Sequence, residues 1–369
     1  MESNYKQLGR FIRQIDLRNN DAGLGEDNLY GISVTKEFIV SHANLVGVTF
    51  DSYKVVAPRQ FAYIPDTSRR GDKIAISLNT TGEKIIVSSI CTVFEIVDED
   101  QLLPEYLMLW FMRPEFDRYA RFMSNGSARE VFDWDCMCGV ELPVPPISEQ
   151  RKIVHDYQVI TDRIELLQKM NEKLEELLYA DFQSKFQAGK EATLKGMPFD
   201  EWKIKELSIL TDFQYGKMVP EEERCEKGYP IFSGYGVTGY YHEYMFEDPR
   251  IVVLARGVSG TGEVRISPKY SYITNLSIAL TLKDEGFFAY LYEYLAHDNL
   301  RALDSGSAQS MITIDSLNKY LIAVPPKEKA VEYDRSFRKV HEIIEANLNE
   351  LETLNQLSSI QLQRLAKGA

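Results

Sequence analysis

The sequence contains no long apolar run. No stretch approaches the roughly 20 consecutive apolar residues that a membrane-spanning helix needs, and no charged-then-apolar leader opens it. We therefore expect a cytoplasmic protein with no membrane partner. Cysteine is also scarce, because there are only four, and none forms a CxxC pair. We expect Cys91, Cys136, Cys138 and Cys225 to be reduced and mostly buried thiols rather than disulfides or metal ligands.

Catalytic and cofactor motifs are missing too. The five histidines are scattered, and none has HExxH spacing. The glycine-rich segment RGVSGTGE, residues 256–263, lacks both the Lys-Ser/Thr ending of a P-loop and the GxGxxG spacing of a dinucleotide site. We find no Asn-Pro-Pro-aromatic methyltransferase motif and no carboxylate cluster typical of a nuclease. The sequence therefore predicts no catalytic residue, no metal and no cofactor.

Basic residues are outnumbered. The 42 Lys and Arg residues face 55 Asp and Glu residues, for a net charge of −13. This balance argues against a simple nucleic-acid binder, although locally basic faces can coexist with acidic helices. With 369 residues, 44% hydrophobic and 11% aromatic, the chain has the composition of a folded protein and the length of two domains plus connectors.

The chain contains an internal repeat. The Val-Pro-Pro turns at 144–146 and 324–326 lie 180 residues apart, and so do the Gly-Ser-Ala segments at 126–128 and 306–308. Asp135 and Asp315 keep the same offset. The segments Glu105-Tyr106-Leu107 and Ala289-Tyr290-Leu291 match with a slip of four residues. Landmarks that share one offset indicate a duplication.

Each copy has the same order of parts. Short β-rich runs bounded by turn residues come first and predict strands. A short helix follows, at about 106–122 in the first copy and 287–303 in the second. The predicted strands include 61–65, 74–78 and 92–96 in the first copy, and 251–254 and 276–280 in the second. The fold class is therefore α+β.

A long helix ends each copy. Ser148 is a good N-cap for the first helix, and apolar residues at alternating steps of four and three form a narrow heptad seam in both helices. Such seams predict an antiparallel coiled coil between the two helices. The expected organisation is a first domain at 1–147, a helix at 148–186, a linker at 187–200, a second domain at 201–326 and a second helix at 327–369.

One polar residue interrupts each seam. If Asn171 lies opposite Asn347, antiparallel pairing also places Leu174 opposite Ile344 and Leu167 opposite Leu351. A polar layer between apolar layers fixes the register of paired helices. We therefore predict an Asn171–Asn347 contact. The alternative is that each asparagine faces a groove or another protein.

The chain resembles the DNA-specificity subunit of type I restriction–modification systems over nearly its full length. The segments that carry the resemblance are GVELPVPPISEQRKI, YKVVAPRQFAYIP, VSSICTVFEI and FSGYGVTGYYHEYMFEDPRIVVLARGVSGTGEV. The second junction, IAVPPKEKAVEY, lacks the Glu-Gln pair found at 149–150. The resemblance implies two target-recognition domains, two long helices and no catalytic site.

Candidate DNA-binding residues are basic, polar or aromatic residues at expected loops. Basic side chains suit phosphates and guanine edges, and Asn, Ser and Thr suit base edges and phosphates. An aromatic side chain between glycines can stack or wedge at a base step. The alternatives are solvated surface charge and, for Arg256, an ion pair with Glu263. The candidates are Arg59, Arg69, Arg70, Lys73, Asn79 and Thr80 in the first domain, and Ser233, Tyr235, Arg256, Ser259 and Thr261 in the second.

We expect a non-catalytic adaptor that reads a bipartite target in double-stranded DNA. A helix of about 37 residues is roughly 55 Å long, which corresponds to about one and a half duplex turns between two half-sites. The resemblance implies that two methyltransferase subunits and restriction subunits assemble with it and carry out methylation and cleavage. The alternative is a duplicated coiled-coil scaffold that binds proteins rather than DNA.

Overall fold

The computed structural model describes residues 5–20, 23–41, 49–67, 71, 73–124, 130–257, 260–304 and 311–367. The chain divides into two compact units. Unit 1 consists of Met1–Leu167 with Glu350–Ala369, and unit 2 consists of Gln168–Asn349. Both ends of the chain therefore belong to unit 1.

Unit 1 is built on a four-stranded antiparallel sheet with the strand order β2-β9-β6-β7. Three two-stranded ladders accompany it, β1-β10, β3-β4 and β5-β8. The inner strand β6 and the edge strand β7 are buried along their whole length. The strands are β1 (Tyr5–Gln7), β2 (Ile12–Ile15), β3 (Tyr30–Ile32), β4 (Phe38–Val40), β5 (Lys54–Val56), β6 (Phe61–Ile64), β7 (Ala75–Leu78), β8 (Ile85–Val87), β9 (Thr92–Ile96) and β10 (Glu141–Pro143).

The helix predicted at 106–122 is two helices, α1 (Pro104–Met112) and α2 (Pro114–Met123). The break has a local cause. Proline disfavours the helical conformation of the residue before it, and Arg113 accordingly has an extended ψ of 135°. A short helix, α3 (Trp134–Cys138), follows, and the Asp133 side chain caps it by accepting a hydrogen bond from the Cys136 amide at 2.8 Å.

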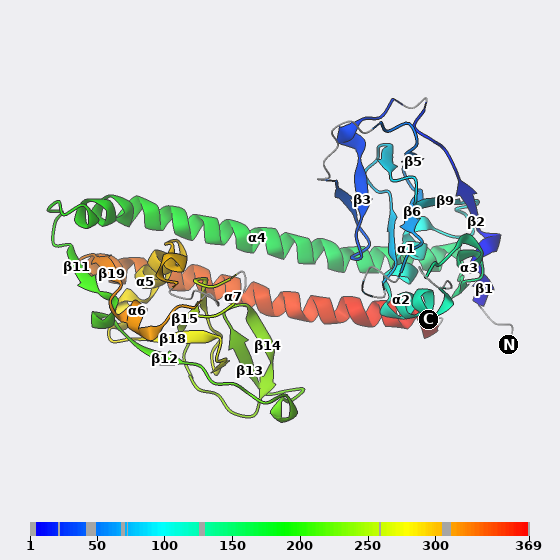
Figure 1. The fold of residues 1–369 in the computed structure, drawn as a ribbon. Helices are drawn as coiled ribbons and strands as arrows, with labels where there is room; N and C mark the ends of the chain where they lie inside the picture. Colours follow the sequence, from blue (N-terminus) through cyan, green and yellow to red (C-terminus); the bar gives the residue numbers. More distant parts are fainter. Residues whose placement is uncertain are drawn as a thin grey trace. The chain divides into compact units, whose positions relative to one another are not determined.

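Unit 2 repeats the four-stranded sheet in the order β12-β18-β15-β16, again antiparallel. A three-stranded sheet, β14-β13-β17, and the ladder β11-β19 lie beside it in the fold (Figure 1). The strands are β11 (Lys203–Glu206), β12 (Thr211–Tyr215), β13 (Tyr229–Ser233), β14 (Gly236–Tyr241), β15 (Ile251–Leu254), β16 (Val264–Ile266), β17 (Tyr272–Ile273), β18 (Ser277–Leu282) and β19 (Leu321–Val324). The short helices are α5 (Phe288–Ala296), the 3-10 turn η6 (Leu300–Leu303) and α6 (Ile314–Asn318).

The duplication extends to individual hydrogen bonds. The Tyr106 hydroxyl donates to the carbonyl of Pro143 at 3.0 Å, and the Tyr290 hydroxyl donates to the carbonyl of Ala323 at 2.5 Å. Both acceptors lie in the strand that leads into the Pro-Pro turn, 180 residues apart. The two copies therefore share a frame that is conserved down to a buried tyrosine.

The long helices are α4 (Ile147–Leu194) and α7 (Lys327–Arg364). The predicted end of the first helix at 186, and with it the predicted linker at 187–200, is wrong, because α4 continues to Leu194. Small and polar residues suggested a linker there. A Cβ on Gly189 would lie only 2.4 Å from the Trp202 ring, so glycine lets this indole pack directly on the helix.

Within each unit, a segment of α4 packs antiparallel to a segment of α7 (Figure 1). In unit 1, Arg163 pairs with Glu350, and the Ser358 hydroxyl lies 3.2 Å from the Tyr157 hydroxyl. In unit 2, the Asn347 amide donates to Asn171 Oδ1 at 2.6 Å, and both side chains are buried. The predicted Asn171–Asn347 contact is therefore present.

The helix junctions differ between the copies. Gln150 is buried, donates to the carbonyls of Gln101 and Pro145, and accepts from the Leu103 amide at 2.9 Å. The residue 180 positions later is Ala330, which is buried without polar atoms in its side chain. In the second copy, which lacks the Glu-Gln pair, an apolar contact therefore takes the place of this polar anchor.

Each unit has its own main core. The cysteines are free, as expected, but only Cys91 is buried. Cys136, Cys138 and Cys225 are half-buried, so the prediction of mostly buried thiols is wrong for three of the four. Among the described residues, no helix is both long and apolar enough to cross a membrane.

Candidate nucleic-acid interface

In unit 1, the loop between β6 and β7, residues 65–74, carries the predicted basic run. At its start, Phe132 donates to the Pro65 carbonyl at 2.9 Å, and Asp66 forms a bridge with Val131. At its end, the Ile74 amide donates to the Asp117 carboxylate in α2 at 3.3 Å. Both ends of this β6–β7 loop are therefore fixed to the fold.

In unit 2, the loop between β15 and β16, residues 255–263, occupies the equivalent place. Ile312 donates to the Ala255 carbonyl at 2.9 Å, and Arg256 forms a bridge with Met311. Met311 lies 180 residues after Val131. The two segments that the sequence singled out on separate grounds thus follow corresponding strands of matching sheets.

Lys73 and Thr80 are exposed on unit 1, as a contact with DNA requires. Asn79 is buried, and its side chain donates to the carbonyls of Val56 and Glu83 and accepts from Thr81. All of its hydrogen-bonding capacity is used by the turn and by Val56 of β5. Asn79 therefore shapes the turn that presents Thr80.

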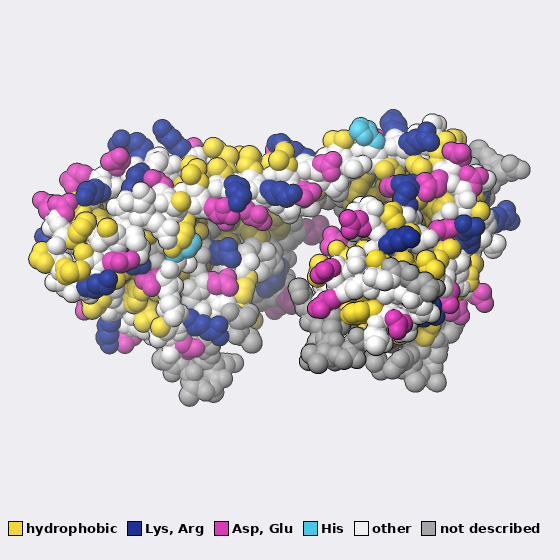
Figure 2. All heavy atoms as spheres, turned by 90° about the horizontal axis from the view of Figure 1, so that it is seen from above, with side chains coloured by type: hydrophobic (Ala, Val, Ile, Leu, Met, Phe, Trp, Pro, Cys, Tyr) yellow, Lys and Arg dark blue, Asp and Glu magenta, His cyan; other side chains and the backbone are white. Residues whose placement is uncertain are grey.

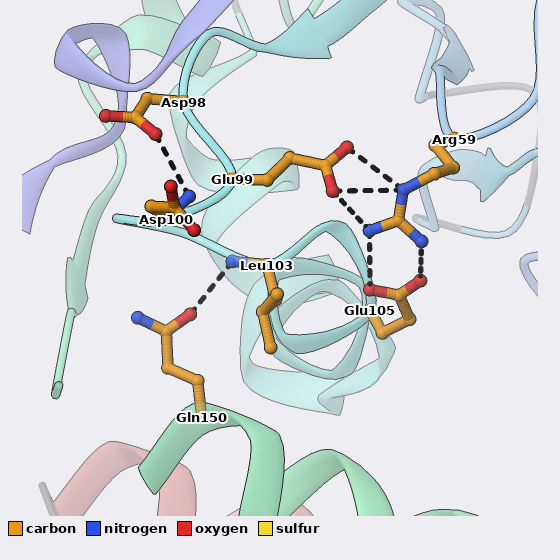
Figure 3. A network of polar contacts seen from close by, with 7 residues as sticks. All are labelled: Arg59, Asp98, Glu99, Asp100, Leu103, Glu105 and Gln150. Carbon is orange, nitrogen blue, oxygen red and sulfur yellow. Dashed lines mark hydrogen bonds and ion pairs between the residues drawn. The ribbon is translucent and has the colours of Figure 1, made fainter. Parts of the chain in front are cut away.

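Arg59 is held by carboxylates (Figure 3). Its guanidinium donates to Glu99 at 2.6 Å and to Glu105 at 2.5 Å. The hydrogen bond to Glu99, reinforced by Glu105, raises the pKa of Arg59 above its ordinary value. Arg59 also has a positive φ of 67°, which is uncommon for a residue with a side chain. The two ion pairs tie the start of β6 to the start of α1. They also neutralise the charge of Arg59 that a phosphate would otherwise contact.

The β15–β16 loop supports an exposed aromatic side chain. Tyr235 is 53% exposed, and its ring lies over two glycines of the loop. A Cβ on Gly257 would lie 2.2 Å from the Tyr235 hydroxyl oxygen, and a Cβ on Gly260 would lie 2.7 Å from the ring. Thr261 is buried and closes the loop by donating to the Gly257 carbonyl at 2.8 Å. Glycine is needed here because the ring and the backbone approach closely.

The polar candidates near Tyr235 differ in exposure. Arg256 is exposed, and it forms no ion pair with any residue that the structure describes. Glu263, the alternative partner, instead lies 3.6 Å from Arg265. Ser233 is buried, and its hydroxyl accepts from the Tyr235 amide at 3.2 Å, so it shapes the turn beneath the ring. Arg69, Arg70 and Ser259 lie outside the described residues.

Sequence reasoning missed two features beside these loops. A Cβ on Gly262 would lie 2.8 Å from the amide nitrogen of Arg301, whose side chain is exposed, so Arg301 borders the β15–β16 loop. In unit 1, Arg118 and Phe122 lie on the exposed face of α2, and Phe122 is 84% exposed. The signal available was an apolar residue four positions after an arginine on the polar face of an amphipathic helix.

Charges of both signs are interspersed among the described side chains on the face shown in Figure 2. Such a face does not attract a polyanion as a whole, so a contact with DNA there would have to rest on local basic groups. Among the described residues, no group of His, Cys, Asp and Glu side chains is arranged to hold a metal ion.

The chain matches the family model for the "Type I restriction modification DNA specificity domain" over residues 70–176 and 199–356. The specificity subunit of the type I restriction enzyme MjaIX of Methanocaldococcus jannaschii is 23% identical over 305 residues, which cover 74% of this chain and 70% of that protein. The MjaVIII specificity subunit of the same organism is 21% identical over 323 residues, which cover 78% of this chain and 75% of that protein. The crystal structure of the type I restriction–modification S subunit from M. genitalium has the same fold, with a TM-score of 0.64, 15% identity, and coverage of 98% of this chain and 95% of that one.

Proposed function

The chain belongs to the type I restriction–modification DNA specificity family, and we propose that each of its units reads one half-site of a bipartite DNA target. The observation that carries the proposal is the equivalent position of the β6–β7 and β15–β16 loops. Each is fixed at its base and bears or borders exposed basic side chains. Family membership favours DNA as the ligand over the alternative, a protein-binding scaffold.

In unit 2, Arg256 and Arg301 supply cationic donors for phosphates or guanine edges, and Tyr235 supplies a ring that can stack on a base. In unit 1, Lys73 and Thr80 have the corresponding roles, together with Arg69 and Arg70. For the described residues, this assignment of roles is supported by exposure, by the absence of described ion pairs at Arg256 and by the rigid base of each loop.

The subunit itself is non-catalytic, and partner subunits methylate or cleave the target. Docking sites for them are available on the long helices. In unit 1, the exposed apolar residues Val159 and Leu166 lie seven residues apart on α4, and in unit 2 Met170 and Leu177 have the same spacing. Residues seven apart share one helix face. We assign these faces to two methyltransferase subunits and place the complex, with its nuclease subunits, in the cytoplasm where the DNA is.

Methylation mapping tests the proposal. Cells with and without the gene should differ by one bipartite methylated motif. Replacing Arg256 and Arg301 together by alanine should relax or abolish the second half of this motif, since a lost base contact costs about 1–3 kcal/mol. The matched control is Lys203→Ala, an exposed lysine on β11. An unaltered motif in the double arginine variant would refute the assignment of this loop to DNA recognition. A genome without a motif difference would refute the proposed function.

The helices set the spacer length in this proposal. One heptad adds about 10.5 Å to a helix, which corresponds to roughly three base pairs at 3.4 Å per step. Deleting one heptad from both α4 and α7 should shorten the preferred spacer by about that amount while the two half-sites stay the same. If the spacer keeps its length, the helices do not measure it.

A further inference from the structure

Three tyrosines form a patch on the surface of unit 2. The ring centroids of Tyr229 and Tyr244 lie 4.9 Å apart, those of Tyr244 and Tyr270 lie 5.3 Å apart, and those of Tyr229 and Tyr270 lie 6.1 Å apart. All three side chains remain exposed, with exposed fractions of 37%, 43% and 41% respectively. The tyrosine patch is thus a contiguous aromatic surface rather than a scatter of single exposed rings.

The patch is separate from the proposed DNA-reading loop. Tyr229 begins β13, whereas Tyr235 lies in the turn after β13 ends at Ser233. Four residue steps along a strand measure about 13 Å. The register pairs Tyr229 with Tyr241 at the open end of the β13–β14 hairpin, and Ser233 with Gly236 at its turn. The tyrosine patch and Tyr235 therefore lie at opposite ends of one hairpin.

The backbone at Tyr270 is strained. Its φ is +52°, a conformation that is a clear outlier for a bulky residue. The surrounding ladder holds it there. The Tyr270 amide donates to the Glu247 carbonyl at 2.8 Å, and Phe246 and Ser271 form an antiparallel bridge next to it. Strain of this kind persists where the structure over-determines it and clusters at functional positions. Here its effect is to direct an exposed ring toward Tyr229 and Tyr244.

Glu247 borders the patch, the exposed Lys269 precedes Tyr270, and the segment that contains Tyr229 and Tyr244 is rich in carboxylates. Residues 221–248 contain seven Asp and Glu residues and only two Lys and Arg residues. The Tyr270 hydroxyl donates to Glu247 Oε1 at 3.3 Å, and the charge of Glu247 raises the pKa of Tyr270. Hydrogen bonding to Glu223 likewise raises the pKa of Tyr241 to about 12. Two neighbouring phenols thus experience a negative potential.

The chemistry of the patch selects its partner. Phosphates would be repelled by the carboxylates, so DNA does not fit this surface. A second copy of this chain carries a net charge of −13 and would be repelled as well. Lysine and arginine side chains fit, because they bind tyrosine faces through cation–π contacts and pair with carboxylates at the rim. Tyrosine is also enriched among the residues that dominate binding energy in protein interfaces.

We propose that the tyrosine patch Tyr229–Tyr244–Tyr270 docks a lysine- or arginine-bearing segment of a protein subunit of the complex. The choice of a partner subunit rests on the proposed function, but the surface is distinct from the DNA-reading loops and from the helix faces. The patch adds a contact between unit 2 and the assembly that does not depend on the target sequence.

Substitution at Tyr270 separates docking from folding. Tyr270→Gly removes the ring and relieves the positive φ, so the melting temperature should stay the same or rise. Tyr244→Ala removes a second ring without a backbone change. We expect either variant of the full chain to bind at least one purified methyltransferase or nuclease subunit about tenfold or more weakly, with DNA binding unchanged. Glu243→Gln with Glu247→Gln should weaken the same interaction and reduce its salt dependence, whereas Glu201→Gln, an exposed control, should not.

Four results would overturn the docking proposal. These are unchanged affinity of both variants for every subunit, a lower melting temperature for Tyr270→Gly, loss of half-site affinity, and altered self-association of the chain. The last two would assign the patch to DNA and to a second copy. A wild-type chain that binds neither DNA nor any subunit would instead refute the proposed function.

Discussion

At the scale of single residues, the Asn171–Asn347 hydrogen bond is a polar link in an apolar layer. Both amides are buried, so each depends on the other to satisfy its hydrogen-bonding groups. The heptad pattern predicted this pairing, because two helices that share the same heptad repeat have few possible antiparallel registers. The pattern could not show whether the two side chains would meet, since that depends on their rotamers and on the packing of the unit.

Removing one member of the pair should be worse than removing both. Asn171→Leu alone leaves the Asn347 amide buried without a partner, which costs about 1–3 kcal/mol. The double Leu variant should recover that loss or exceed the wild-type stability, while the helices lose their fixed register. Urea unfolding of the two variants provides the measurement. Equal stabilities for the single and double variants would show that the hydrogen bond has no part in the packing.

His341 predicts a pH dependence. Burial lowers its pKa, and the nearby Arg338 charge lowers it further, although Glu345 opposes the shift. Its ring stacks on Phe337 at 5.5 Å. The unfolded chain binds a proton at His341 near pH 6.5, whereas the folded chain resists it, so the unfolded state takes up more protons below that pH. The stability contributed by neutral His341 is therefore present above pH 6.5 and is lost as the pH falls toward the lowered pKa.

Denaturant unfolding at pH 7.5, 6.5 and 5.5 checks this sign. The His341→Gln variant should lose less stability on acidification than the wild type. His242→Gln is the control, because the side chain of His242 is 58% exposed. A steeper acid loss in His341→Gln than in the wild type would contradict the assignment.

At the scale of elements, alternation and turn residues predicted the central strands of both sheets, because buried β-branched runs have few other uses. Two features were not predicted. The Arg113-Pro114 step divides one expected helix into two, and Trp202 stabilises α4 by packing on Gly189, beyond the predicted end of the helix. The first needed proline's effect on its neighbour, and the second needed a contact across the chain.

Among the candidate site residues, the same limit separates those whose exposure could be predicted from those whose partners could not. Lys73, Tyr235 and Arg256 are exposed as expected, because loop residues between strands usually face solvent. The occupation of Arg59 by Glu99 and Glu105 follows from the fold of three separate segments. Residue type alone does not reveal such partners.

The packing of Tyr235 on the β15–β16 loop can be tested by substitution. Gly260→Ala places a Cβ 2.7 Å from the Tyr235 ring and 2.8 Å from the Leu254 side chain. The ring must move, so we expect severalfold weaker binding of the second half-site and unchanged reading of the first. Gly25→Ala is the matched control, because its Cβ meets no atom within 4 Å and its φ is not in the left-handed range. Competition with oligonucleotides mutated in one half-site measures the effect, and equal losses at both half-sites would show a general folding defect.

At the scale of the whole molecule, the sequence repeat and the compact units have different boundaries. The repeat divides the chain near the linker, whereas unit 1 includes Glu350–Ala369 from the far end. Leu365 is buried in the core of unit 1, and the Tyr5 hydroxyl donates to the Ala366 carbonyl at 2.6 Å. The 180-residue offset revealed the repeated order of elements. It did not show that the end of the second long helix belongs to unit 1.

Truncation after Asn349 should therefore destabilise the unit at the opposite end of the sequence. Unit 1 would lose the buried side chains of Leu351 and Leu365, which contribute about 3–6 kcal/mol together at 1.5–3 kcal/mol each. Unit 2 should keep its stability, because it contains none of the deleted residues. Calorimetry and amide hydrogen exchange can follow the units separately. Uniform destabilisation of both would contradict the division.

The division also gives the chain an order of folding during its synthesis. Unit 2 is continuous in sequence and is complete once Asn349 has left the ribosome. Unit 1 begins earlier but must wait for the last twenty residues, Glu350–Ala369, before its core can close. Domains generally fold as units, and the N-terminal one usually folds first. Here the domain that is translated first is the last to complete its fold. Any chain released before Glu350–Ala369 is made therefore contains an incompletely folded unit 1.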